Sequence, residues 1–221
     1  MKKSIAFLPK KNREDLKYLV ELILDKIPVC EMIILYGSYA RGTYVSYDER
    51  EEFGIPTSFK SDYDILVINS AWSYDKIENK LASVRNIYDK RGDHRYRVPV
   101  QFIHDSIKKV NEDLKYSRYF YTELKRDGIM LYNRGKNKLA RRKPLKFGEI
   151  KKQGEEYFRY AEHILKQLSS DDYLAQEGEN HGFVLLHSVG SFPHDSEIDT
   201  PLNYADYYYL EALKRYKDLK E

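Results

Sequence analysis

The stretch Gly37-Ser-Tyr-Ala-Arg-Gly42, followed further along by Asp62-Tyr-Asp64, decides the fold that we expect for this chain. An apolar run at residues 31–36 leads into the first motif, and another at residues 65–68 follows the second. Short apolar runs separated by segments of helical periodicity predict buried strands that alternate with helices. Residues 1–133 are therefore predicted to form a domain of mixed helices and strands, of the α/β (α+β) class.

The Gly-Ser turn has the features of a phosphate-binding loop. Gly37 allows close approach to the backbone, Ser38 adds a hydroxyl donor, and a short helix is expected to begin near Ser38 and to add its dipole. Arg41 has two interpretations, a phosphate ligand or a brace for the loop. The dipeptide alone is also common in ordinary strand-to-helix turns.

Asp62 and Asp64 are two residues apart on a predicted strand, so their side chains share a face. Two carboxylates at the mouth of a buried strand repel each other unless a cation lies between them. Oxygen-only ligands favour Mg²⁺, which completes its shell with water and substrate phosphates. The pair therefore predicts a magnesium site, although a lone Asp-x-Asp is also a common polar strand entry.

Together the two motifs resemble the nucleotidyltransferase superfamily that includes DNA polymerase beta, and most closely the minimal nucleotidyltransferases of bacteria and archaea. The likeness covers about residues 12–133 and implies a small mixed sheet with flanking helices. It implies that Gly37 and Ser38 bind the triphosphate and that Asp62 and Asp64 bind Mg²⁺. The implied reaction transfers a nucleoside monophosphate, AMP from ATP, to a hydroxyl acceptor and releases pyrophosphate.

Two features depart from that family's pattern. Residues 39–61 separate Ser38 from Asp62, an interval longer than usual, and residues 44–60 are expected to be an inserted loop. Many members also place a third carboxylate on the following strand, where this chain has Gln101 at the equivalent position. Asp105 is a second candidate for that role, although it is also suited to cap the next helix.

Other element boundaries follow from capping residues and prolines. Asn12 is expected to cap a helix that ends before Pro28, and a strand is expected over residues 97–104. Residues 183–189 are expected to end a helix, and Thr200 is expected to cap the last one, with proline at its first position.

The basic segment at residues 134–146 contains seven Lys or Arg among thirteen residues. We interpret it as a linker between domains, with a phosphate-binding arm as the alternative. Residues 147–221 are then expected to form a smaller, all-helical domain.

That domain resembles the start of a HEPN domain, a helical partner of such nucleotidyltransferases. The likeness lies in Phe158 and Ala161 and in the run at residues 183–187, with His194 and Asp195 as later pieces. It implies a homodimer through the helical domain. No ribonuclease activity is expected, because no arginine closely precedes His194 as in the ribonucleases of that family.

Composition narrows the class of protein. The chain has 221 residues, 33% of them charged, yet its net charge of +3 is too small to indicate nucleic-acid binding. Cys30 is the only cysteine, so no internal disulfide can form, and the apolar runs are too short to span a bilayer. A cytoplasmic protein that does not enter the membrane is expected.

The function predicted from these features is Mg²⁺-dependent nucleotidyl transfer from ATP or another nucleoside triphosphate. Because Gln101 cannot take up a proton, a catalytically weak nucleotide-binding or regulatory protein is the alternative. An antitoxin-like role with a HEPN-type partner is a further alternative, by analogy alone. The acceptor, whether a small molecule, RNA or protein, stays open.

Overall fold

The computed structural model describes residues 1–2, 4–52, 55–92, 97–190 and 197–220. The chain divides into two compact units, Met1–Leu145 and Lys146–Glu221. No helix in the described part of the chain is long and apolar enough to cross a membrane.

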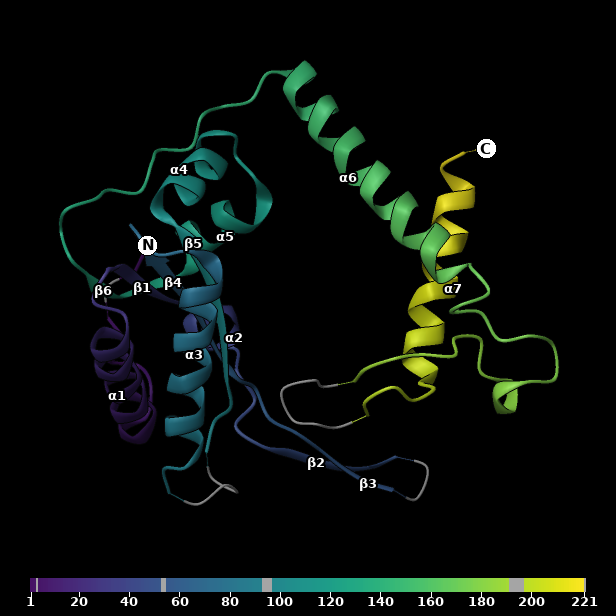
Figure 1. Cartoon of the computed structure of the whole chain (residues 1–221), viewed down its shortest axis with the longest axis horizontal. Helices are drawn as coiled ribbons and strands as arrows, with labels where there is room; N and C mark the ends of the chain where they lie inside the picture. The colour runs from purple at the N-terminus through teal and green to yellow at the C-terminus, as the bar shows by residue number, and fades with distance from the viewer. Residues whose placement is uncertain (3, 53–54, 93–96, 191–196, 221) are drawn as a thin grey trace. The chain divides into compact units, whose positions relative to one another are not determined.

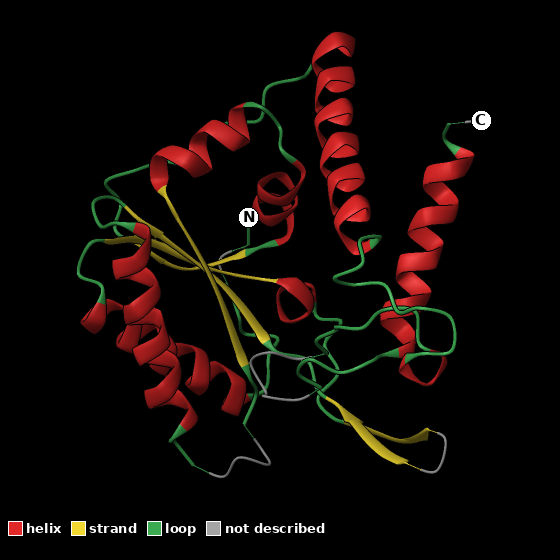
Figure 2. Cartoon of the chain, turned by 45° about the vertical axis from the view of Figure 1, so that its right-hand side comes forward, coloured by secondary structure: helices red, strands yellow, loops and turns green. Residues whose placement is uncertain are grey.

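A four-stranded mixed sheet forms the centre of the first unit (Figures 1 and 2). Its strands are β1 (Cys30–Tyr36), β4 (Tyr63–Asn69), β5 (Val100–Ser106) and β6 (Ile129–Asn133), in the order β5-β4-β1-β6. Strand β4 is parallel to β5, and β1 is antiparallel to both β4 and β6. This arrangement confirms the predicted α/β class and mixed sheet.

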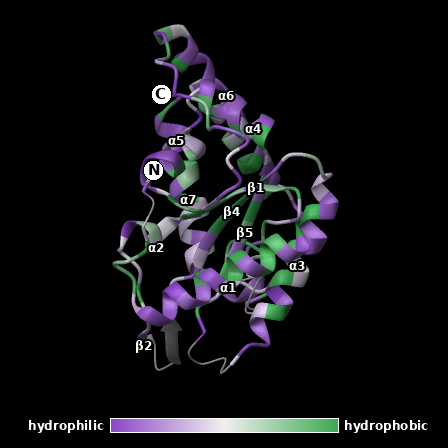
Figure 3. Ribbon diagram, turned by 90° about the vertical axis from the view of Figure 1, so that its left-hand side faces the viewer, coloured by the Kyte–Doolittle hydropathy of each residue, from purple (hydrophilic) through white to green (hydrophobic). Residues whose placement is uncertain are grey.

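Helices cover both faces of this sheet, because its central strands are apolar on both sides. Even-numbered side chains of β1 and β4, such as Ile34 and Leu66, face α4 (Ile107–Lys115) and α5 (Tyr119–Asp127). Odd-numbered ones, such as Ile33 and Ile65, face α1 (Lys10–Lys26) and α3 (Tyr74–Asp89). Figure 3 shows the hydrophobic strands β4 and β5 among these helices. We refer to the two sides as the α4/α5 face and the α1/α3 face.

The expected loop at residues 44–60 was wrong in its main part. Strands β2 (Asp48–Glu52) and β3 (Ile55–Phe59) pair there as an antiparallel hairpin that is separate from the central sheet (Figure 2). The ends of the insertion are tied together, since Val45 N–H donates to Ser61 Oγ at 2.9 Å and Ser61 N–H donates to the Val45 carbonyl at 2.9 Å. The extra length therefore leaves and re-enters the unit at one point beside the two motifs.

The basic segment lies against the first unit. Residues 134–145, which we call the basic strap, pass α4 after β6 (Figure 1) and pack Leu139 and Ala140 on the α4/α5 core. Asn111 on α4 donates to the Lys138 carbonyl at 3.1 Å and accepts from Ala140 N–H at 2.7 Å. Ser117 Oγ donates to the Lys143 carbonyl at 2.7 Å. These bonds hold the strap to α4 and to the turn between α4 and α5.

The second unit contains two helices, α6 (Phe147–Leu168) and α7 (Asn203–Asp218), in the part of it that the structure describes. The expected helix end at residues 183–189 was wrong, because this segment is extended and only η2 (Asn180–Gly182) precedes it. The buried Asp206 of α7 accepts from Val184 N–H at 2.8 Å and from Leu185 N–H at 2.9 Å. These bonds anchor the extended segment to α7. His194 and Asp195 lie outside the described residues.

Three capping predictions were also wrong. Helix α1 begins at Lys10, and Asn12 inside it donates to Tyr63 Oη at 2.7 Å. Ser106, one residue after Asp105, caps α4 by accepting from Lys109 N–H at 3.2 Å. Helix α7 begins at Asn203, three residues after Thr200. Asn12 had a partner elsewhere and Asp105 had a better-placed neighbour, which local capping rules do not reveal, whereas α7 begins after Leu202 without a side-chain cap.

Candidate functional site

The Gly-Ser turn begins where β1 ends, and α2 (Gly37–Arg41) follows directly. Gly37 has a φ of +69°, a conformation that side-chain-bearing residues rarely adopt. A Cβ atom on Gly37 would lie 1.8 Å from Asp64 Oδ2. The carboxylate of Asp64 therefore occupies the space that any other residue at position 37 would fill.

Strand β4 carries the two carboxylates to this turn. Asp64 pairs with Tyr36 at the end of β1 on one side and with Gln101 on β5 on the other. Tyr63 between the two aspartates is fully buried on the α1/α3 face, so Asp64 points to the opposite, α4/α5 face. Asp62 lies just before the strand and is partly exposed, like Asp64.

The electrostatics of the pair show that the two carboxylates are close. The pKa of Asp64 is raised to about 6, mainly by burial and then by the charge of Asp62, while the charge of Arg41 opposes the shift. The pKa of the Tyr36 hydroxyl is raised by burial and then by the charges of Asp64 and Asp62. A cation between the two aspartates would relieve this repulsion.

Arg41 is exposed at the end of α2. The pKa of Asp127 on α5 is lowered chiefly by its hydrogen bond with Arg126, and the charge of Arg41 adds a smaller effect in the same direction. Arg41 lies near enough to Asp64 to affect the pKa of that carboxyl as well. The side chain therefore has two acidic neighbours in the unbound protein. This position is compatible with both interpretations of Arg41, a brace or a phosphate ligand.

The donor set fits Mg²⁺ in its chemistry. Asp62 and Asp64 supply carboxylate oxygens, and Gln101 supplies a neutral side chain beside Asp64. No group of three or more His, Cys, Asp or Glu side chains gathers in a metal-binding arrangement within the described residues. A metal ion here would take the rest of its shell from water and substrate.

Asp105 is not part of this site, so its prediction as a replacement carboxylate was wrong. It pairs with Ile68, near the far end of β4 from Asp64. Its side chain accepts a hydrogen bond from the Tyr121 hydroxyl, whose pKa is raised by burial and by that bond. Asp105 therefore has a structural role in the α4/α5 core.

Sequence reasoning missed two aromatic neighbours of the site. Tyr36 directly precedes Gly37, and its ring meets Phe120 of α5 edge to face, with centroids 5.5 Å apart. The position of Tyr36 next to the Gly-Ser turn was a signal that could have identified it. Phe120 gave no such signal, because it reaches the site only through the packing of α5 on the sheet.

No protein-family model matches the chain. Among curated proteins, an unsaturated glucuronyl hydrolase of Formosa agariphila is 46% identical over 63 residues, which are 28% of this chain and 16% of that protein. The chain thus spans about a sixth of the length of the curated relative that it matches.

Partial likeness is found to solved structures of a nucleotidyltransferase, a toxin–antitoxin complex and a glucuronyl hydrolase. A nucleotidyltransferase of Sulfolobus solfataricus is 18% identical, with 59% of this chain and 94% of the other covered and a TM-score of 0.35. A complex of the tri-AMPylated HEPN toxin of Shewanella oneidensis with MNT antitoxin is 12% identical, with 71% of this chain and 91% of the other covered and a TM-score of 0.31. A heparin-specific unsaturated glucuronyl hydrolase is 63% identical, but only 33% of this chain and 20% of the other are covered, and the TM-score is 0.30. TM-scores of this size do not establish a common fold.

Proposed function

We propose that the first unit is a Mg²⁺-dependent nucleotidyltransferase that moves AMP from ATP to a hydroxyl acceptor and releases pyrophosphate. The observation that carries this proposal is the contact between Gly37 and the Asp64 carboxylate. It supports the proposal because the backbone that would bind phosphate lies against the oxygens that would bind the metal ion, as a triphosphate with its metal ion requires.

Each residue of the site has a distinct role in this proposal. The Gly37 and Ser38 backbone and the Ser38 hydroxyl bind phosphate oxygens, and Arg41 adds positive charge beside them. Asp62 and Asp64 would hold Mg²⁺, which supplies charge neutralisation for the leaving pyrophosphate when bound. Catalysis then depends on positioning and on preorganised charge.

Proton removal from the acceptor falls to water in this proposal. Gln101, the neighbour of Asp64 on β5, cannot take up a proton, and Asp64 itself would be a ligand of Mg²⁺. The acceptor hydroxyl would therefore lose its proton to a water molecule as its oxygen attacks.

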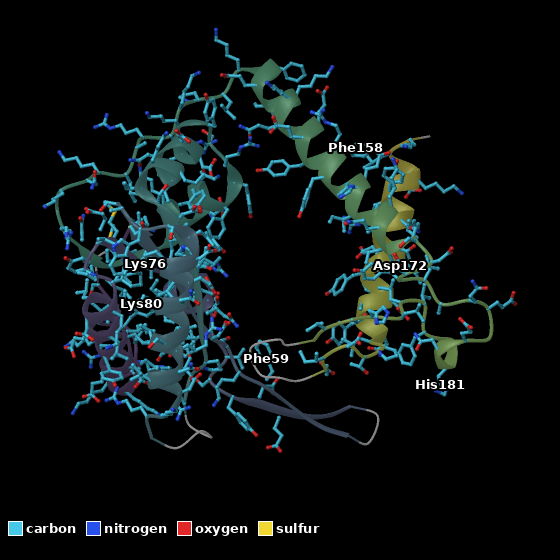
Figure 4. The ribbon with its side chains drawn as sticks, in the orientation of Figure 1. Phe59, Lys76, Lys80, Phe158, Asp172 and His181 are labelled. Carbon is cyan, nitrogen blue, oxygen red and sulfur yellow. The ribbon has the colours of Figure 1, made fainter. Side chains whose placement is uncertain are left out.

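The test uses α-labelled ATP, Mg²⁺ and candidate hydroxyl acceptors, with wild type and an Asp62→Asn/Asp64→Asn variant. We expect label transfer by wild type and a loss of at least a hundredfold in the variant. The matched control is Asp171→Asn/Asp172→Asn, two exposed neighbours in the second unit (Asp172 is labelled in Figure 4). Equal labelling by wild type and the Asp62/Asp64 variant would refute the proposal.

A second candidate is a nucleotide-binding or regulatory protein without turnover. The neutral Gln101 at the register position beside Asp64 favours it. Calorimetry separates the two candidates, because both require ATP binding with Mg²⁺ but only an enzyme forms product over hours. Absence of binding would contradict both.

We also make proposals for the second unit and for the partners of this protein. We propose that the 63-residue likeness to the glucuronyl hydrolase lies in Lys146–Glu221, which carries neither motif of the site. A HEPN-type homodimer, an antitoxin-like role and a cytoplasmic location are retained as predictions.

The hydrolase likeness does not extend to an activity in this proposal. A segment equal to 16% of that protein is too short to supply a whole sugar-binding site and its catalytic groups. We therefore propose no sugar hydrolysis for this chain.

A further inference from the structure

The positive charge of this protein is concentrated in one stretch of the first unit. Residues 107–145, which form α4, α5, β6 and the basic strap, contain twelve Lys or Arg against four Asp or Glu. The whole chain has a net charge of only +3, so the rest of the molecule is acidic on balance. Net charge therefore conceals a strongly basic region.

The strap presents its charges outward because its backbone and apolar residues are fixed. Leu139 and Ala140 face the core, and the carbonyl of Lys138 accepts from Asn111. The side chains that flank these anchors are exposed: Lys136, Lys138, Arg141, Arg142 and Lys143. A solvated, mobile linker would not need such anchors, whereas a row of held cations is suited to the regular charges of a polyanion.

Exposed aromatic rings lie next to the point where the strap is held. Tyr119 at the start of α5 is 72% exposed and Tyr116, in the turn that Ser117 ties to the strap, is 59% exposed. Phe120 follows Tyr119 and contacts Tyr36, which directly precedes Gly37. The start of α5 therefore adjoins the strap on one side and the Gly-Ser turn on the other, a path of cations and exposed rings.

We propose that this path binds a single-stranded polynucleotide, with phosphates on the basic strap and bases stacked on the rings of Tyr116 and Tyr119. Aromatic stacking requires unpaired bases, so a single strand fits better than a duplex. A terminal hydroxyl of the strand would reach the aspartates as the acceptor, an inference that rests on the proposed function. Attack of that oxygen would form a new bond to the α-phosphorus and break the bond between the α-phosphorus and the leaving pyrophosphate, and the acceptor proton would pass to water.

Binding is tested without ATP or Mg²⁺, by fluorescence anisotropy of a labelled single-stranded RNA, with a DNA strand of the same sequence as a second arm. The strap variant is Lys138→Ala/Arg141→Ala/Arg142→Ala. We expect it to bind at least tenfold more weakly at low salt and to lower the slope of log affinity against log salt by about 2, since each lost phosphate contact removes about 0.7. The control, Lys17→Ala/Lys80→Ala/Lys90→Ala, removes three cations of the α1/α3 face (Lys80 is labelled in Figure 4) and should bind like wild type.

Stacking has its own variant. Tyr119→Ala should weaken binding by about fivefold or more and leave the salt slope unchanged, because it removes a ring and no charge. Equal losses in the strap variant and the control would overturn the proposal. Binding to anionic lipid vesicles but to neither strand would also overturn it.

The failure of this inference can be told apart from failure of the proposed function. Label transfer from ATP to another hydroxyl, without strand binding, would overturn the inference alone. Strap-dependent strand binding without transfer to any acceptor would sustain the binding site and contradict the enzyme. The Asp62→Asn/Asp64→Asn variant should bind the strand at least as well as wild type, because it loses only negative charge.

Discussion

Gly37 combines a left-handed backbone with a close approach to Asp64, and the two effects can be separated. Gly42 at the end of the same short helix has a φ of +81°, but a Cβ there would meet only Phe7, at 3.6 Å. Both glycines therefore resist substitution through the backbone, while only Gly37 does so through a clash with the site.

Gly37→Ala is expected to lower the free energy of unfolding more than Gly42→Ala. The left-handed conformation costs about 1–2 kcal/mol in each, and displacement of Asp64 adds about 1–3 kcal/mol in the first. Urea denaturation measures the difference, and calorimetry should show loss of ATP binding with Gly37→Ala alone. Equal effects of the two substitutions would contradict the contact between Gly37 and Asp64.

Asp64→Asn is expected to stabilise the protein without bound metal. The raised pKa means that the folded protein holds a proton more tightly than the unfolded chain, so wild type loses stability as pH rises from about 4 to about 6. The gain of the variant in free energy of unfolding over wild type should be largest above pH 6, at about 1 kcal/mol once solvent screening is discounted. This gain should vanish below pH 4.

Thermal unfolding at several pH values measures this advantage. Added Mg²⁺ should raise the melting temperature of wild type and leave that of Asp64→Asn unchanged. A variant that is less stable than wild type at pH 8 would show that the carboxylate has a favourable partner in the unbound protein.

At the scale of elements, the parallel register of β4 and β5 fixes which residue accompanies Asp64. Gln101 is its direct neighbour, while Asp105 lies beside Ile68 near the other end of the pair. The amide therefore occupies the position from which a third carboxylate would act.

Gln101→Glu is expected to raise the rate of nucleotidyl transfer about tenfold or more, because it adds a proton acceptor beside the reacting groups. The added charge should also raise the pKa of Asp64 and move the pH optimum upward. Initial rates across a pH series provide the measurement. Asp105→Asn should leave the rate of nucleotidyl transfer unchanged. A loss of rate with this substitution would contradict the register argument.

Asn111→Ala tests how the strap is held to α4. Loss of the bonds to the Lys138 carbonyl and from Ala140 N–H should lower stability by about 1–2 kcal/mol. Trypsin should then cut faster after Arg141 and Arg142, which chain-length analysis would detect. Asn79→Ala, at an exposed position of α3, is the matched control and should change neither property.

At the scale of the whole molecule, the two units differ in how much core they have. The first unit buries apolar side chains on both faces of its sheet, including Leu16, Ile33 and Leu66. In the second unit Leu185, Leu202 and Tyr209 are the buried apolar residues among those described, and α6 contributes none. A helix without a buried face draws little stability from packing.

A fragment of residues 1–145 is expected to fold and to bind ATP with Mg²⁺ like the full chain, since its core and site are self-contained. A fragment of residues 146–221 is expected to melt without cooperativity or to self-associate through its exposed aromatic residues, such as Phe147 and Tyr160. Circular dichroism melts and sedimentation provide the measurements. A cooperative melt of the second fragment would favour an independent domain, as the HEPN interpretation requires.

The sequence by itself determined the α/β class and the strand ends at the two motifs. These depend on short-range periodicity, which the order of residues fixes directly. It did not determine the hairpin at residues 48–59, because strand pairing within an insertion has no strong period of its own. Helix starts at residues 12 and 200 failed for a similar reason, since packing outweighed local capping.

Only the tertiary structure decided what lies around the motifs. The contact of Gly37 with Asp64, the neighbour Gln101 and the exclusion of Asp105 all follow from how β1, β4 and β5 align. The basic strap is held by residues of α4 and its following turn, which are distant in sequence. Residues far apart in the chain become neighbours only when the sheet and its helices pack, and that packing sets the charge and reach of the site.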